Sequence, residues 1–279
     1  MEQGRTAQIM DNLIAAGKAV PMIVVSANSN VRSRNGGMGG GYNWQGMQTF
    51  RSELLENVLP FVEKTYRVKK DRKSRAMCGL SMGGGQSFYI GLRDPEVFAN
   101  VGVFSTGMFG GISGASNFDL ESEVPGMLTD TKTFNKQFDV FFVSCGEQDP
   151  RIEYTRNIVK KMREGGVEVR FNSYPGDHEW QVWRKSLHEF AQYLFKEVSY
   201  LSQNISSAIC AIKMSGMPYL NFLCRVLWCQ TFIPSQAPTL PPITANPRSV
   251  ASGIRHLERF AFILSMPYTM NVTTLMAIK

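Results

Sequence analysis

Apolar residues follow two different spacings along the first 198 residues, and the change between them marks a series of strands and helices. Short runs of adjacent apolar residues predict buried strands over residues 22–25, 74–78, 97–104, 139–144 and 167–174. Apolar residues three or four positions apart predict helices over residues 6–16, 48–66, 86–92, 153–164 and 181–198. Because strands alternate with helices, we expect an α/β fold, a mostly parallel sheet with helices on both faces.

Two segments and one proline interrupt this alternation. Residues 28–43 are rich in glycine and predict a loop, which is either a flexible linker or a wall beside a site. Pro60 lies inside a predicted helix, where we expect a kink or a break. Residues 117–138 are polar and predict a partly helical insertion between two strands. Such insertions often form lids or acyl pockets in α/β enzymes.

The end of the chain differs in composition from the rest. Residues 201–279 carry six Lys and Arg but one acidic residue, so most of the net charge of +7 lies there. They show no sustained apolar period, and we expect residues 199–279 to be a poorly ordered extension of a domain at 1–198. A small accessory domain is the alternative. Because the excess charge lies outside the patterned region, no nucleic-acid partner is expected.

Composition also argues against a membrane span, a disulfide framework and a metal site. Residues 260–278 are uncharged, but a proline, an asparagine and three threonines argue against a membrane span. The five cysteines contain no C-x-x-C pair and predict neither a disulfide framework nor a zinc site. We expect Cys78 and Cys145, at strand ends, to be buried thiols. No metal or cofactor is expected, no secretion signal is visible, and the compartment and oligomeric state stay open.

The strongest motif is Gly79-x-Ser81-x-Gly83, between a predicted strand and a predicted helix. This is the pattern of a nucleophile elbow, in which a serine on a sharp turn exposes its hydroxyl. A chance match in a glycine-rich loop is the alternative, but the flanking strand and helix favour the elbow. The backbone N–H of Met82, the residue after Ser81, is then a candidate donor to an oxyanion hole.

A nucleophilic serine needs a base that takes its proton. The chain has three histidines. His178 lies on a loop after the predicted strand at 167–174, whereas His188 lies within a predicted helix and His256 in the poorly patterned extension. Catalytic groups of parallel sheets gather at the carboxyl ends of strands, so His178 is the preferred base.

The base in turn needs a carboxylate that orients it. Asp149 lies just beyond the predicted strand at 139–144 and is the preferred candidate. Glu147 and Glu153 are alternatives, although each is equally typical of a solvated loop or helix-start charge. Asp177 is adjacent to His178 in sequence, and adjacent side chains diverge, so we expect it to be structural. The resulting order Ser81, Asp149, His178 is that of α/β-hydrolases.

Aromatic residues near the predicted site are candidates for substrate binding. Tyr42 and Trp44 follow the glycine-rich loop, and Trp180 follows His178 closely. Such rings are suited to an aromatic acyl group or a sugar. We expect Trp183, which lies within a predicted helix, to pack in the core.

Three motifs in order give the chain a family resemblance: Gly79-Leu-Ser-Met-Gly-Gly84, Cys145-Gly-Glu-Gln-Asp149 and Tyr174-Pro-Gly-Asp-His-Glu-Trp180. With residues 2–14 and 21–25, they resemble the esterase D/feruloyl esterase group, carbohydrate esterase family one, over residues 2–198. The resemblance implies an α/β-hydrolase fold and hydrolysis of acyl esters, commonly ferulate or acetate, on plant xylan. Its triad positions fall on Ser81, Asp149 and His178.

The chain departs from the family at both ends. Members carry earlier strands and a His-Gly oxyanion loop, so we expect a chain lacking its first strands, with reduced or absent activity. The family pattern ends near residue 198, before the unrelated-looking extension. The leading hypothesis is a serine esterase acting on small or oligosaccharide esters. The alternatives are a thioester hydrolase of the S-formylglutathione type and a non-catalytic remnant that binds a carbohydrate or a partner.

Overall fold

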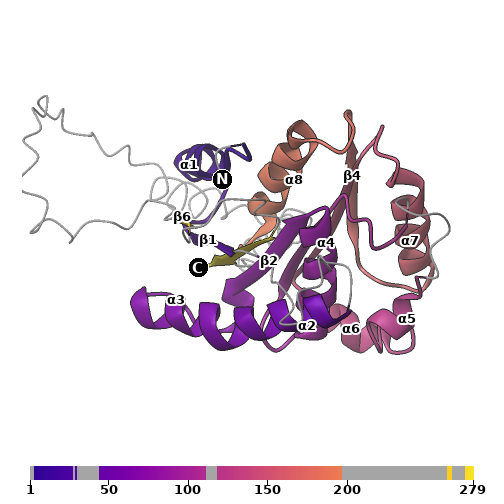
Figure 1. The fold of residues 1–279 in the computed structure, drawn as a ribbon, viewed down its shortest axis with the longest axis horizontal. Helices are drawn as coiled ribbons and strands as arrows, with labels where there is room; N and C mark the ends of the chain where they lie inside the picture. The colour runs from indigo at the N-terminus through magenta and orange to yellow at the C-terminus, as the bar shows by residue number, and fades with distance from the viewer. Residues whose placement is uncertain (1–2, 28, 30–43, 111–117, 197–262, 266–273) are drawn as a thin grey trace, which may run out of the picture. The chain divides into compact units, whose positions relative to one another are not determined.

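The computed structural model describes residues 3–27, 29, 44–110, 118–196, 263–265 and 274–279. These residues form a seven-stranded sheet flanked by helices, in the strand order β5-β4-β3-β2-β7-β1-β6 (Figure 1). The strands are β1 Ile23–Ala27, β2 Arg75–Leu80, β3 Asn100–Phe104, β4 Val140–Gly146, β5 Arg170–Tyr174, β6 Ile263–Ser265 and β7 Thr274–Ile278. Neighbouring strands from β2 to β5 are parallel, as are β1 and β6. The expected α/β fold is therefore confirmed.

Helices cover both faces of this sheet. They are α1 Thr6–Ala15, α2 Trp44–Ser52, α3 Leu59–Thr65, α4 Met82–Gln86, α5 Leu120–Glu123, α6 Thr131–Gln137, α7 Ile152–Glu164 and α8 Trp180–Tyr193. Two π-helical segments are η1 Glu53–Val58 and η3 Ser87–Gly91, and one short 3-10 helix is η2 Arg72–Ser74. Each strand and helix predicted from the apolar pattern is present, with shifted ends. Within the described residues, no helix is both long enough and apolar enough to cross a membrane.

The alternation of side chains along β2 explains how two helical layers share one sheet. Ala76 and Cys78 pack in a buried cluster with residues of α1 and α8, whereas Met77 packs in a cluster with residues of α2, η1 and α3. Successive strand residues point to opposite faces, so both faces of β2 are apolar. A third cluster joins β3 and β4 to α5, α6 and α7. Figure 1 shows α1 and α8 on one side of the sheet and α2 and α3 on the other.

The helix predicted around Pro60 continues through the proline. It runs as α2, η1 and α3, and η1 is a wider, π-type turn that ends two residues before Pro60. A proline in a helix removes one N–H donor, and a wider turn is one way in which a helix accommodates that loss. The predicted break is therefore replaced by a change in helical winding.

The strand β7 was not predicted. It lies between β1 and β2 and runs antiparallel to both. Met276 and Ile278 are buried within it. The apolar pattern predicts a poorly ordered extension here, because five residues are too few to show a period and their burial depends on pairing with distant strands. The described end of the extension is thus part of the sheet, and the domain boundary at residue 198 stays a prediction.

Candidate active site

Ser81 lies on a strained turn between β2 and α4. Its backbone has φ 52° and ψ −116°, and α4 begins at the next residue, Met82. A positive φ is unfavourable for a residue with a side chain and persists only where surrounding contacts hold it. The Ser81 N–H donates to the carbonyl oxygen of Phe104 at 2.8 Å, which ties the turn to the end of β3. The expected strand, turn and helix around the serine are all observed.

Gly84 allows α4 to lie close to the neighbouring strand. A Cβ atom at this position would lie 2.8 Å from the Phe104 carbonyl oxygen and 3.2 Å from Thr106 Cβ. The first distance is too short for a side chain and involves backbone that cannot move independently, and the second is a tight contact. The glycine after the elbow therefore fixes the direction in which α4 leaves Ser81.

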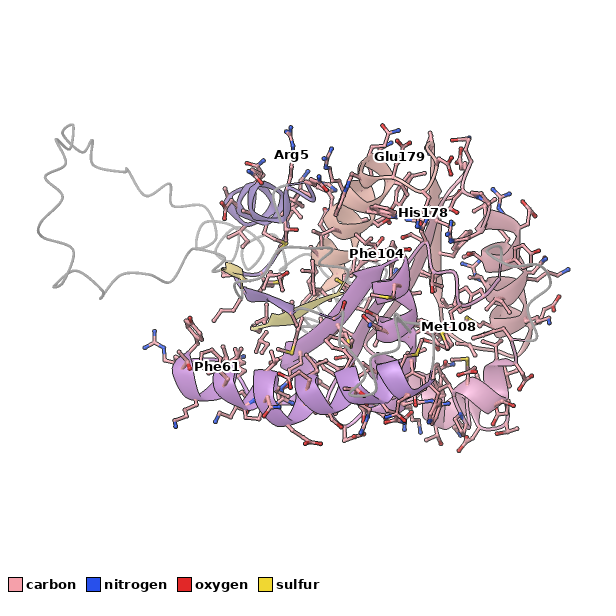
Figure 2. All side chains as sticks on the ribbon, viewed as in Figure 1. Arg5, Phe61, Phe104, Met108, His178 and Glu179 are labelled. Atoms are coloured by element: carbon pink, nitrogen blue, oxygen red, sulfur yellow. The ribbon has the colours of Figure 1, made fainter. Side chains whose placement is uncertain are left out.

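His178 connects Ser81 to Asp149 through both ring nitrogens. Its Nε2 lies 2.9 Å from Ser81 Oγ, and its Nδ1 lies 2.7 Å from Asp149 Oδ2. An ionised carboxylate only accepts hydrogen bonds, so Nδ1 carries the proton and Nε2 accepts from the serine hydroxyl. Figure 2 shows His178 and Phe104 near the same end of the strands. The structure thus brings together three side chains that are far apart in the sequence.

Asp149 is the fully buried member of this arrangement, with a side-chain exposure of 0%. Burial raises the pKa of this carboxyl, but hydrogen bonds from His178 and Arg151 outweigh that effect and lower it to about 2. The group is therefore ionised at neutral pH, as a carboxylate that stabilises a protonated imidazole must be. Glu147 and Glu153, the alternatives, do not contact His178 in any hydrogen bond of the described residues.

Arg151 is a site residue that the sequence motifs do not reveal. Its backbone N–H and its guanidinium Nη1 each donate to Asp149 Oδ1 at 3.0 Å. The two oxygens of Asp149 are thus divided between His178 and Arg151. No sequence signal marks this contact, because it depends on how the chain turns after Asp149.

The loop that carries His178 is hydrogen-bonded to the loop that carries Asp149. The Gln148 N–H donates to the Gly176 carbonyl at 3.0 Å, and the Gly176 N–H donates to Gln148 Oε1 at 2.6 Å. Gly176 has φ 130°, which favours glycine. A Cβ atom at Gly146 would lie 2.6 Å from the Asp177 carbonyl oxygen. A residue with a side chain at position 146 would therefore push the two loops apart. Asp177 is exposed and accepts from the His178 backbone N–H, consistent with the expected structural role.

Two tryptophans of α8 form an aromatic wall next to His178. The Trp183 ring meets the imidazole edge to face, with centroids 4.9 Å apart, and Trp180 meets Trp183 at 5.2 Å. Trp183 also packs against the cluster under α1 and α8, as expected, but the sequence does not reveal its contact with the imidazole. Trp180, a predicted substrate-binding residue, is therefore one ring away from His178.

The other predicted binding residues have different surroundings. Trp44 is 56% exposed and packs edge to face on Tyr89, with the Arg93 guanidinium over both rings. None of these ring contacts involves the Ser81, His178 or Asp149 side chains. Tyr42 lies outside the described residues. Met82 opens α4, and the first N–H groups of a helix have no acceptor within the helix.

Cys78 and Cys145 are buried free thiols, as predicted. Burial raises the pKa of each thiol to about 12, so neither is ionised at neutral pH. A nucleophilic cysteine needs a thiolate. Neither thiol near the elbow is therefore in the ionised form that a cysteine nucleophile requires.

The sheet with a serine on a strained turn after a central strand defines an α/β-hydrolase-type protein. The chain belongs to the esterase family, because the family model described as "putative esterase" matches residues 1–194. This membership agrees with the resemblance seen in the three sequence motifs.

Individual relatives carry esterase names. The chain is 32% identical over 195 residues to an endo-1,4-beta-xylanase/feruloyl esterase of Xylanibacter ruminicola, covering 70% of this chain and 24% of that protein. It is 18% identical to an acetyl esterase of Caldicellulosiruptor saccharolyticus, covering 53% of this chain and 65% of that protein. A solved ferulic acid esterase is 25% identical, with a TM-score of 0.53, covering 69% of this chain and 77% of that one. The chain thus spans less than two thirds of both curated relatives.

Proposed function

We propose that the chain is a serine esterase that hydrolyses feruloyl or acetyl esters of plant cell-wall polysaccharide. The single observation that carries this proposal is the continuous line of contacts from Ser81 Oγ to His178 and on to Asp149, at 2.9 Å and 2.7 Å. A serine, a base and a buried carboxylate in this geometry are suited to acyl transfer.

In the first half of the reaction, Ser81 Oγ attacks the carbonyl carbon of the ester while His178 Nε2 takes the hydroxyl proton. The resulting tetrahedral oxyanion accepts a hydrogen bond from the Met82 N–H, directly after the nucleophile. The C–O bond to the alcohol then breaks, and the protonated His178 gives its proton to the departing oxygen. The products of this half are the free sugar hydroxyl and an acyl-serine.

In the second half, a water molecule replaces the sugar alcohol. His178 Nε2 takes a proton from the water, whose oxygen attacks the acyl carbon. Collapse of the second tetrahedral intermediate returns the proton to Ser81 Oγ and releases the carboxylic acid. Asp149 stays ionised throughout, since its pKa of about 2 is far below neutral pH, and it stabilises the imidazolium in both halves.

The substrate class rests on the relatives and on the aromatic wall. One curated relative is named an endo-1,4-beta-xylanase/feruloyl esterase, and another is named an acetyl esterase. Trp180 and Trp183 present ring surfaces beside His178, and such surfaces suit a hydroxycinnamoyl group or a sugar face. Trp44 is exposed, and its ring contacts the Tyr89 ring and the Arg93 guanidinium. It therefore offers a second ring surface.

Hydrolysis of methyl ferulate and of p-nitrophenyl acetate tests the proposal. We expect labelling of Ser81 by a fluorophosphonate probe, turnover below ordinary esterase rates in line with the reduced activity expected from the sequence, and loss of both in Ser81→Ala. The matched control is Ser52→Ala on α2, a serine outside the site, which should keep both. Unchanged turnover in Ser81→Ala would remove the serine from its role. Absence of both turnover and labelling in the unmodified chain would favour the non-catalytic alternative, and faster hydrolysis of S-formylglutathione would favour the thioester hydrolase.

A further inference from the structure

A cavity of about 490 Å³ lies beside α8, outside the group formed by Ser81, His178 and Asp149. Side chains from three elements or their flanks line it, among them Arg5, Tyr174, Arg184, Lys185, His188 and Glu189. Arg5 precedes α1, and Tyr174 ends β5. Figure 2 shows Arg5 at the start of α1 with its side chain directed away from the sheet. Its lining includes none of Ser81, Asp149 and His178.

Among the nine residues that line the cavity, three are cations and one, Glu189, is a carboxylate. Arg5, Arg184 and Lys185 each carry a positive charge, and none of the ion pairs within the described residues includes any of them. Arg184 donates through Nε to the Gln3 carbonyl oxygen at 3.1 Å, a neutral acceptor that leaves its charge uncompensated. Because these three cations outnumber the one carboxylate of the lining, the cavity carries a net positive charge that attracts an anion.

The acidic residue in the lining, Glu189, keeps its negative charge but is held in place by neutral donors. Glu189 accepts hydrogen bonds from three neutral donors, Tyr174 at 2.5 Å, Tyr193 at 2.8 Å, and Asn172. Burial raises the pKa of Glu189, but these hydrogen bonds outweigh it and hold the pKa below its ordinary value. Its carboxylate is thus fixed in the wall by hydroxyl and amide groups, without an ion pair to Arg5, Arg184 or Lys185.

Arg5 is held in an unusual backbone conformation at the edge of this cavity. Its φ of 50° and ψ of 34° are left-handed, a region that residues with side chains rarely occupy. Such strain persists where other contacts impose it and is frequent at functional sites. Arg5 thus adds a cation from the start of α1 to the lining that Arg184 and Lys185 share.

The cavity and the aromatic wall share the helix α8. Trp180, Arg184 and His188 are spaced four residues apart and so lie along one face of α8. Trp180 packs on Trp183, which packs on His178. A chain of sugar units that crosses the aromatic wall and continues along α8 therefore reaches the cationic cavity.

We propose that this cavity binds the carboxylate of an acidic sugar unit, a uronic acid, carried by the same polysaccharide whose ester reaches Ser81. The inference rests on the proposed function for its choice of a sugar. A uronate presents two oxygens to guanidinium and ammonium donors and hydroxyl groups to Tyr174 and His188. The site would make the enzyme prefer esters on acidic over neutral regions of the polymer.

Direct binding tests this inference without turnover. The full chain is titrated calorimetrically with a xylo-oligosaccharide that bears one uronic acid, with the neutral oligosaccharide of equal length, and with inorganic phosphate. We expect the acidic oligosaccharide to bind at least about tenfold more tightly than the neutral one, and added salt to reduce that difference. In Arg5→Asn/Lys185→Gln the preference should fall about tenfold. Asparagine is chosen because it tolerates the left-handed backbone at position 5.

The matched control is Arg67→Asn/Lys132→Gln, which removes two exposed cations elsewhere and should keep the preference. Equal affinity for the acidic and neutral oligosaccharides, equal loss in the control, or phosphate binding tighter than the acidic oligosaccharide would each overturn the inference. Melting curves of each variant verify folding. A failure to hydrolyse methyl ferulate would overturn the proposed function but leave the binding preference measurable, so the two failures are distinguishable.

Discussion

At the scale of single residues, Asp149 stands out because its two oxygens serve different partners. Oδ2 accepts from His178, and Oδ1 accepts twice from Arg151. The guanidinium withdraws part of the negative charge that would otherwise stabilise a protonated imidazole. Arg151 does not touch the reacting atoms, so it is a positioning residue that acts through Asp149. Its removal should therefore change the pH dependence of the reaction as well as its rate.

We predict that Arg151→Met moves the acid limb of the kcat/KM profile to higher pH. The sign follows because a carboxylate relieved of its cation stabilises the protonated imidazole more strongly, and the protonated ring cannot act as a base. Turnover at the new optimum should fall only a few fold, because the Arg151 backbone N–H still holds Oδ1. The measurement is a pH–rate profile with methyl ferulate.

Arg151→Lys is the matched control, since it keeps the charge and loses the planar fork. Its acid limb should stay near that of the unmodified enzyme. An unshifted limb in Arg151→Met would show that the guanidinium does not influence the imidazole.

The position of each triad candidate could be predicted because each follows a strand. Ser81 has the elbow motif, and Asp149 and His178 come just after two predicted strands, so they were expected at one edge of the sheet. Their proximity is observed, and their catalytic roles stay predictions. Arg151 could not be selected in this way. Its contact depends on how the chain turns after Asp149, and one arginine beside a helix start is equally typical of a solvated charge.

At the scale of elements, β7 is central to the sheet although it comes last in the chain. It pairs with β1 over Ile23–Ala27 and with β2 over Arg75–Gly79, so both neighbours depend on it. Ile278 is fully buried, and Thr274 pairs with Gly79, two residues before Ser81. A strand with two partners contributes ladder hydrogen bonds on both sides as well as apolar burial.

We predict that Ile278→Ala lowers the free energy of unfolding by roughly 2–5 kcal/mol, the usual cost of a large-to-small change in a core. The smaller change Ile278→Val should cost roughly 0.5–1.5 kcal/mol. Urea unfolding followed by fluorescence measures both. If neither variant shifts the midpoint, β7 does not contribute to the stability of the sheet.

The elements that could be predicted from sequence are those with enough residues to show a period. The amphipathic helix α7 and the run that forms β4 satisfy this condition, and their ends differ by at most a few residues from prediction. In β7 the pattern is too short, and its partners are far away in sequence, so local spacing carries no signal. The wide turn η1 has the same difficulty, because Pro60 predicts an irregularity but not its form.

At the scale of the whole chain, two interpretations of residues 199–279 lead to opposite expectations. Composition predicts a domain of residues 1–198 that folds independently of residues 199–279. The sheet order instead puts Thr274–Ile278 between β1 and β2, which pair with no other strand on that side. Without β7, facing edges of β1 and β2 would carry unpaired N–H and C=O groups, and β1 would lose its connection to the sheet.

We predict that a chain ending at residue 198 is less stable than the full chain by about 3–6 kcal/mol, because the burial of Met276 and Ile278 is worth about 1.5–3 kcal/mol each. Domains are stable by about 5–15 kcal/mol, so this loss leaves a marginal fold with exposed strand edges that aggregates on concentration. Urea midpoints and light scattering of the two chains measure the difference. Equal midpoints for the 198-residue chain and the full chain would instead support the boundary predicted from composition and show that β7 adds nothing to the sheet.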